Sequence, residues 1–185
     1  MPATEKKQMY LYKTGDGNPP SIVRRKIAAT QGIFMPGAPC YISTSGTVKL
    51  SDTSDGTGDT HHGFIVGLAA GPVTTAWPLT AELAADTVVL VQIIDSADTY
   101  VVYVESGGSD SAAAQTVVGD QLGLVVSTTA GEIGYTTANI AETTNVAVQV
   151  DDLWSNLVPE KETTSTSPGR VTCHFLPAVI DVVRA

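Results

Sequence analysis

Apolar positions in this chain gather in short runs of β-branched and aromatic residues, each closed by Gly, Asp, Asn or Ser. Runs of this kind are typical of strands separated by turns. The predicted strands lie near Met9–Lys13, Ile22–Ala28, Pro39–Ser43, Val48–Ser51, Gly63–Leu68, Val88–Ile94, Thr99–Glu105, Gln121–Ser127, Glu132–Thr136, Val146–Val150 and Arg170–Leu176. Their close succession predicts an all-β fold, with a small β-barrel or sandwich-like body.

Helical periodicity is nearly absent, so few or no helices are expected. The best helical candidate is Leu79–Asp86, where Leu79 and Leu83 share a face. The second candidate is a short turn at Ala112–Gln115. Both segments are short and flanked by strand patterns.

Turn residues between neighbouring strands predict three hairpins and, at least in part, a β-meander. The predicted pairs are Val88–Ile94 with Thr99–Glu105 around Asp95–Asp98, Leu122–Ser127 with Ile133–Thr136 around Thr128–Gly131, and Cys40–Ile42 with Val48–Leu50 around Thr44–Gly46.

Charge is distributed unevenly along the 185 residues. Residues 1–49 hold seven basic and two acidic residues, whereas the remainder holds three basic and seventeen acidic residues, and the whole chain carries −9. A basic segment joined to an acidic β body indicates a protein that docks by one end onto an acidic surface. The same negative net charge argues against a protein that chiefly binds nucleic acid.

The basic residues predict an extended N-terminal arm at residues 1–30, ahead of a β-rich domain at 31–185. The predicted docking residues are Lys6, Lys7, Lys13, Arg24, Arg25 and Lys26. If residues 22–27 are extended, Arg25 projects opposite Arg24 and Lys26, which suits a strand laid across a partner. A basic edge strand that discourages aggregation is an equally good interpretation.

No motif in the sequence predicts an enzyme, a cofactor or a metal site. The densest group of potential ligands is Asp52, Asp55 and Asp59 with His61–His62, but the aspartates lack EF-hand spacing and adjacent histidines in a strand point apart. A GxSxG elbow, a P-loop and a GxGxxG turn before a helix do not occur. We expect a solvated acidic loop instead.

Cys40 and Cys173 form neither a disulfide framework nor a CxxC motif, so free, buried thiols are expected. The longest apolar runs, such as Val101–Val104, are far shorter than the roughly 20 residues that cross a bilayer. The N-terminal residues do not resemble a signal peptide, which favours synthesis and retention in the cytoplasm.

Three stretches give the chain a resemblance to the head decoration, or cement, proteins of tailed bacteriophages. They are Gln31–Ile42 (QGIFMPGAPCYI), Gly63–Ala69 (GFIVGLA), and Val118–Val125 (VGDQLGLV) with the closing Val171–Pro177 (VTCHFLP). The resemblance implies a virion protein made in the host cytoplasm that binds the major capsid protein from outside the shell, often as trimers or dimers, without catalysis. This chain differs from the simplest members of that family in its long basic N-terminal arm.

Self-association is expected to use the apolar strands of residues 88–105 and a tryptophan. The predicted interface residues are Trp77, Trp154, Val101 and Tyr103. Two other functions remain open. One is a receptor- or glycan-binding module, which needs an exposed aromatic patch. The other is a β-sandwich coat subunit whose basic arm faces the genome.

Overall fold

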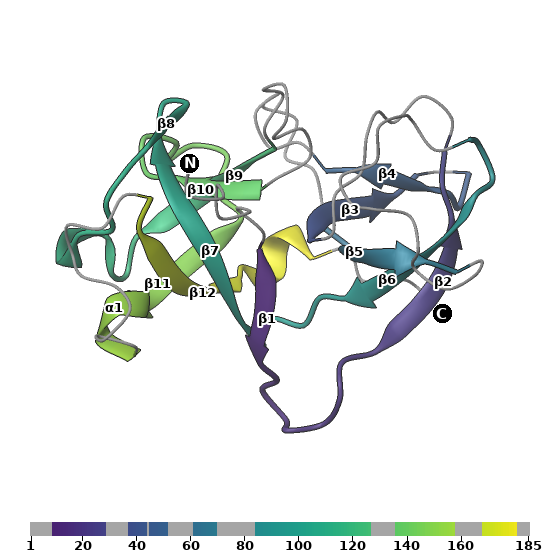
Figure 1. Ribbon diagram of the computed structural model, residues 1–185, viewed down its shortest axis with the longest axis horizontal. Coiled ribbons are helices and arrows are strands. Elements are labelled where there is room, and N and C mark those ends of the chain that lie inside the picture. Colours follow the sequence, from purple (N-terminus) through teal and green to yellow (C-terminus); the bar gives the residue numbers. More distant parts are fainter. Residues whose placement is uncertain are drawn as a thin grey trace, which may run out of the picture.

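The computed structural model describes residues 9–28, 37–43, 45–51, 61–69, 84–126, 136–157 and 168–180. These residues form two sheets that lie side by side (Figure 1). The strands are β1 (Tyr10–Lys13), β2 (Ile22–Lys26), β3 (Ala38–Ile42), β4 (Val48–Leu50), β5 (Gly63–Leu68), β6 (Val88–Ile93), β7 (Thr99–Ser106), β8 (Ser109–Asp110), β9 (Gln121–Val126), β10 (Thr136–Asn139), β11 (Val148–Leu153) and β12 (Arg170–Phe175). The fold is all-β, as the sequence predicted.

The first sheet closes into a five-stranded barrel. Its order is β7-β10-β9-β11-β12, and β12 pairs again with β7. Only the contact between β10 and β7 is parallel. Two further strands, β1 and β8, pair with β7 outside this ring. Among the described residues, every strand of this ring is therefore paired on both sides.

The second sheet has the order β2-β6-β5-β3-β4, with antiparallel neighbours throughout. It curls until its two ends approach, because Ile27, just after β2, forms a bridge with Val48 at the start of β4. Over residues 22–26, β2 pairs with β6 on one edge, and no described strand pairs with its other edge.

Each sheet encloses its own apolar core. The larger core fills the barrel and includes Val102, Leu124 and Val150, while the smaller one gathers Cys40, Ile65 and Val91. The larger core reaches the second sheet at an aromatic junction, where rings from β5, β7 and β12 pack at centroid distances of 5.2–5.5 Å. These rings belong to Phe64, Tyr100 and Phe175. The sheets therefore share one continuous hydrophobic contact.

Two of the three hairpin predictions describe the strand pairing correctly. Strands β3 and β4 pair antiparallel with Tyr41 opposite Lys49, and Gly46 in their turn has φ of 77°. Strands β9 and β10 also pair antiparallel from Thr136 onward, and residues 127–135, which hold the predicted turn and most of the second predicted strand, lie outside the described residues.

The third predicted hairpin is wrong. Strand β6 belongs to the second sheet and β7 to the barrel, so Asp95–Asp98 link the two sheets instead of reversing the chain within one. The strand pattern was correct at both positions, but β7 uses both its edges for β1, β10 and β12. A turn signal cannot identify the strand that eventually occupies an edge.

Helical structure is sparse among the described residues. It consists of α1 (Trp154–Leu157) and two 3₁₀ helices, η2 (Gln115–Val117) and η3 (Pro177–Val179). Of the predicted helix at 79–86, residues 84–86 form a turn in which Asp86 has φ of 65°, and the rest lies outside the described part.

The prediction of an N-terminal arm separate from the β body requires correction for residues 9–28. These residues are extended, but β1 pairs with β7 of the barrel and β2 pairs with β6 of the second sheet. Met9 is buried in the barrel core and Ile27 in the smaller core. Burying these side chains favours integration over an arm held away from the body.

Candidate binding surfaces

An aromatic surface covers the outer face of β1, β7 and β12. Direct cross-strand partners point to the same side of a sheet, so Tyr10 shares its face with Val101, and Arg170 shares its face with Tyr103. Because β1 alternates, Tyr12 lies on the outer face with Tyr10 while Leu11 packs against the barrel core. The two tyrosines are 40% and 49% exposed.

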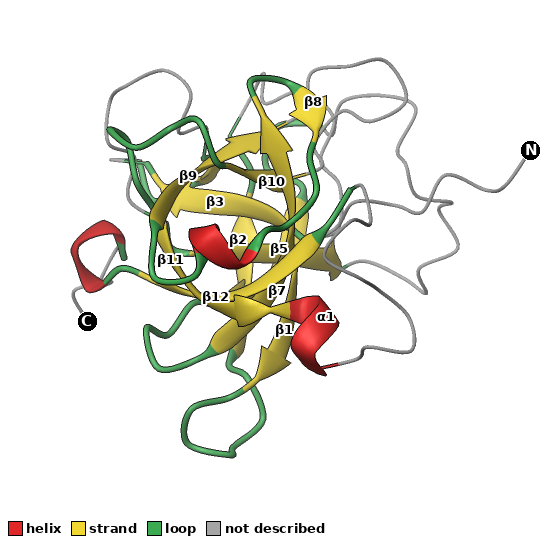
Figure 2. Ribbon diagram, turned by 90° about the vertical axis from the view of Figure 1, so that its left-hand side faces the viewer, coloured by secondary structure: helices red, strands yellow, loops and turns green. Residues whose placement is uncertain are grey.

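Trp154, the first residue of α1, completes this surface. Its ring lies 6.5 Å from that of Tyr10 and 5.1 Å from that of Tyr12, with interplanar angles of 84° and 89°. The guanidinium carbon of Arg170 lies 5.6 Å from the Trp154 ring and 5.4 Å from the Tyr103 ring. Figure 2 views the barrel end of the molecule and shows α1 at its surface. We call Tyr10, Tyr12, Trp154 and Arg170 the aromatic patch.

The residues predicted for self-association lie partly on this face, but two of them are not accessible. Val101 is fully buried and Tyr103 is 4% exposed, because both lie in the central strand under the aromatic patch. They stabilise the protomer itself and cannot form an interface. Trp77 lies outside the described residues.

Sequence reasoning overlooked Tyr10 and Tyr12. The sequence Tyr10-Leu11-Tyr12-Lys13 already indicated that both tyrosines share one face, because side chains in a strand alternate with a two-residue period. The contact with Trp154, which is distant in the chain, could not be read from that string.

A basic surface occupies β2, in the second sheet. Burial alternates along the strand, so Arg24 and Lys26 are exposed while Arg25 is partly buried. Lys26 forms an exposed ion pair of 3.5 Å with Asp86, and the side chain of Arg25 donates a hydrogen bond to the Arg24 carbonyl. Arg24 makes no ion pair with any described residue.

The six predicted docking residues do not form one continuous arm. Lys13 ends β1 beside the barrel, whereas Arg24, Arg25 and Lys26 lie on β2 in the other sheet. In Figure 1, β2 lies at the opposite end of the molecule from α1. Lys6 and Lys7 fall outside the described residues.

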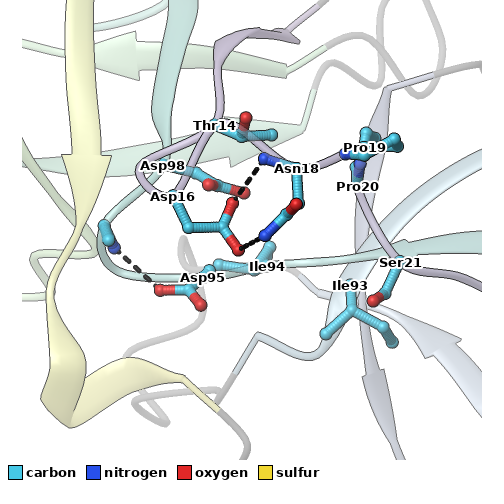
Figure 3. A pocket seen from close by; sticks show the side chains of 11 residues that line it. Thr14, Asp16, Asn18, Pro19, Pro20, Ser21, Ile93, Ile94, Asp95 and Asp98 are labelled. Carbon is cyan, nitrogen blue, oxygen red and sulfur yellow. Dashed lines mark hydrogen bonds between the residues drawn. The ribbon is translucent and has the colours of Figure 1, made fainter.

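A pocket of about 140 Å³ lies where two links cross between the sheets (Figure 3). One link joins β1 to β2 and the other joins β6 to β7. The backbone N–H of Gly15 donates to Asp98 Oδ1 at 2.9 Å, which ties the first link to the second. A Cβ on Gly15 would collide with the carbonyl oxygen of Ala97, so only glycine permits this approach.

The other two carboxylates around this pocket, Asp16 and Asp95, serve local turns. Asp16 accepts hydrogen bonds from the backbone and side chain of Asn18, which lower its pKa, and Asp95 accepts one from the Ala97 N–H. Across the described residues, no three His, Cys, Asp or Glu side chains are placed to hold a metal ion. The aspartates predicted as a solvated loop, residues 52, 55 and 59, lie outside the described part.

The comparisons with known proteins give no relative of this chain. No family model, curated protein or solved structure matches it. None of the described helices has the length and apolar character needed to span a bilayer.

Both cysteines are free and buried, as predicted. Burial raises the pKa of the Cys40 thiol to about 12 and also raises that of Cys173. Neither thiol is a nucleophile at neutral pH, because the reactive thiolate is scarcely populated.

His61 is likewise fully buried, with its ring centroid 5.4 Å from that of Phe175. Neither of its ring nitrogens has a hydrogen-bond partner among the described residues. Burial lowers its pKa from 6.5 to about 4. A neutral ring packed in this way contributes to the core rather than to a surface site.

Proposed function

We propose that this chain is a structural virion protein that binds the major capsid protein from outside an assembled phage shell and stabilises that shell. The observation that carries the proposal is the basic strand β2. It exposes Arg24 and Lys26, and one edge of residues 22–26 has no strand partner in the described part of the chain. Resemblance of the sequence to decoration proteins supports the same function.

Docking through β2 would combine backbone pairing with charge. An extended segment of the shell protein can add to a sheet edge through main-chain hydrogen bonds, and basic side chains select an acidic segment. Strand β2 is held by its pairing with β6, so it need not become ordered on binding. The contact is small, which favours a homotrimer or homodimer that engages several sites at once.

Docking can be tested with particles that lack the protein. The triple variant Arg24→Gln, Arg25→Gln, Lys26→Gln should show reduced occupancy after co-sedimentation with such particles. Wild-type occupancy should fall as salt rises from 0.1 to 1 M, because the Debye length shrinks from about 10 Å to about 3 Å.

A matched pair of single variants controls for net charge. Arg24→Gln on β2 and Lys49→Gln on β4 each remove one positive charge, but only the first should weaken docking. Equal occupancy for both would remove β2 from the docking surface. No binding of the wild-type protein to particles at any salt concentration, with electron micrographs unchanged by its addition, would overturn the proposed function.

A further inference from the structure

The aromatic patch brings two strongly exposed tyrosines together with a tryptophan and an arginine on one face. Tyr10 and Tyr12 come from the first described strand, whereas Trp154 and Arg170 come from the last third of the chain. Tyrosine and tryptophan are enriched at binding interfaces, because each combines an apolar ring with a polar group. The patch is separate from β2, which belongs to the other sheet.

The rings are held before any ligand arrives. Strand β1 is paired with β7, which fixes the spacing of Tyr10 and Tyr12. Trp154 lies between the buried residues Leu153 and Ser155, and the Arg170 guanidinium stacks on its ring. A ligand would therefore meet ordered rings and would lose less free energy to their immobilisation.

The size of the patch limits what it can bind. Tyrosine side chains bury about 150–250 Å² when fully covered, so rings that are 40% and 49% exposed offer on the order of 200 Å² together. A standard protein interface needs about 800 Å² from each partner. The patch suits a ligand of a few rings better than a protein surface.

Charge also limits the class of ligand that the aromatic patch can bind. The chain carries −9 overall, and the acidic excess lies entirely beyond residue 49, in the part that contributes Trp154. Asp151 and Asp152 precede Trp154 and oppose a polyanion, while the Arg170 cation is already stacked on the indole, so a neutral ligand fits best. Asp152 and Asn156, two residues to either side of Trp154, add a carboxylate and an amide that are already hydrogen-bonded to each other at 2.6 Å.

We propose that the aromatic patch binds a neutral polysaccharide by stacking pyranose rings on Tyr10 and Tyr12, which pack against Trp154. The C–H face of a pyranose matches the negative face of an aromatic ring, and its hydroxyl groups face outward to polar neighbours and water. Both tyrosine rings lie nearly perpendicular to the indole and pack against it, which limits their motion before a sugar ring binds.

The binding test uses the purified full-length protein without particles. Isothermal titration with cellohexaose, chitohexaose, maltohexaose and mannohexaose should give saturable binding to at least one of them, with Kd of about 1 mM or tighter. Tyr10→Ala/Tyr12→Ala should weaken that binding by about tenfold or more. Tyr41→Ala on β3 is the matched control and should bind like wild type.

Three outcomes would overturn the proposal. They are no saturable binding to any of the four hexasaccharides, equal binding by wild type and the double tyrosine variant, and binding only to heparin or to single-stranded oligothymidylate. If the double variant is unstable by thermal melting, Tyr12→Phe and Tyr12→Ser supply the comparison, because only the first keeps the ring. Arg24→Gln should keep full glycan binding, so this test and the docking test can fail separately.

Discussion

At the scale of single residues, His61 is the side chain whose environment departs most from its usual one. It packs against Phe175 with no exposed surface. A neutral imidazole is tolerated there, whereas an imidazolium would be buried without a compensating charge among the described residues. The folded state therefore resists protonation of this ring.

The low pKa of His61 predicts acid sensitivity. The ring takes up a proton near pH 6.5 when unfolded but only near pH 4 when folded, so stability is fully present above pH 6.5 and is lost as pH falls toward 4. The loss from this residue should be about 3 kcal/mol between pH 7.5 and pH 4. Urea unfolding followed at both pH values measures it.

Substitution of His61 distinguishes its contribution to the pH dependence of stability from the contribution of the carboxylates. His61→Leu should remove about 3 kcal/mol from the change in unfolding free energy between pH 7.5 and pH 4. Replacing the partly exposed His174 by Gln should leave the His61 contribution unchanged. An identical pH dependence in wild type and His61→Leu would contradict the assigned burial.

At the scale of elements, β5 contains two glycines that lie in different surroundings. A Cβ on Gly63 would collide with the Gln92 carbonyl of β6, whereas a Cβ on Gly67 would meet only Leu90 Cδ1 at 3.8 Å. The close approach at Gly63 lets β5 pair with both β3 and β6 beside the aromatic junction.

A pair of alanine variants tests this difference within one strand. Gly63→Ala should lower the free energy of unfolding by about 1–3 kcal/mol, because β6 must shift. Gly67→Ala should be neutral or stabilising by up to about 1 kcal/mol, since it restricts the unfolded chain without a clash. Denaturant unfolding of both variants gives the comparison, and equal losses would show that the contact at Gly63 is not limiting.

At the scale of the whole molecule, the two ends differ in chemistry. Strand β2 presents cations at one end of the long axis, and α1 lies at the other end (Figure 1). A protein that docks through β2 would therefore direct α1 away from the shell. The proposed docking and the proposed glycan site can then operate on the same particle.

The proposed shell binding also predicts self-association. One β2 contact is too small for a standard interface, and linking two or three of them can raise apparent affinity by about 10² to 10⁴. Sedimentation of the free protein should give a dimer or trimer. A monomer that also binds particles singly and without cooperativity would contradict this prediction, and Val101 and Tyr103 can play no part in the interface because they are buried.

The sequence by itself determined the secondary structure and the class of fold. Short β-branched runs located nine of the described strands closely and β11 with an error of two to three residues, because alternation and turn residues act locally. The predicted strand at 132–136 shares only Thr136 with β10, and β8 and α1 were not predicted. Free buried cysteines followed from the number and spacing of the cysteines. The alternation of Arg24, Arg25 and Lys26 was predicted for the same local reason.

Only the tertiary structure decided which strands pair and which faces remain exposed. Strands β6 and β7 carry a turn between them yet enter different sheets, because the edges of β7 are occupied by strands distant in the chain. Residues 9–28 joined both sheets because Met9 and Ile27 gain apolar burial there. The aromatic patch depends on the contact of Tyr12 with Trp154, and a contact between residues so far apart in the chain arises from folding rather than from local pattern.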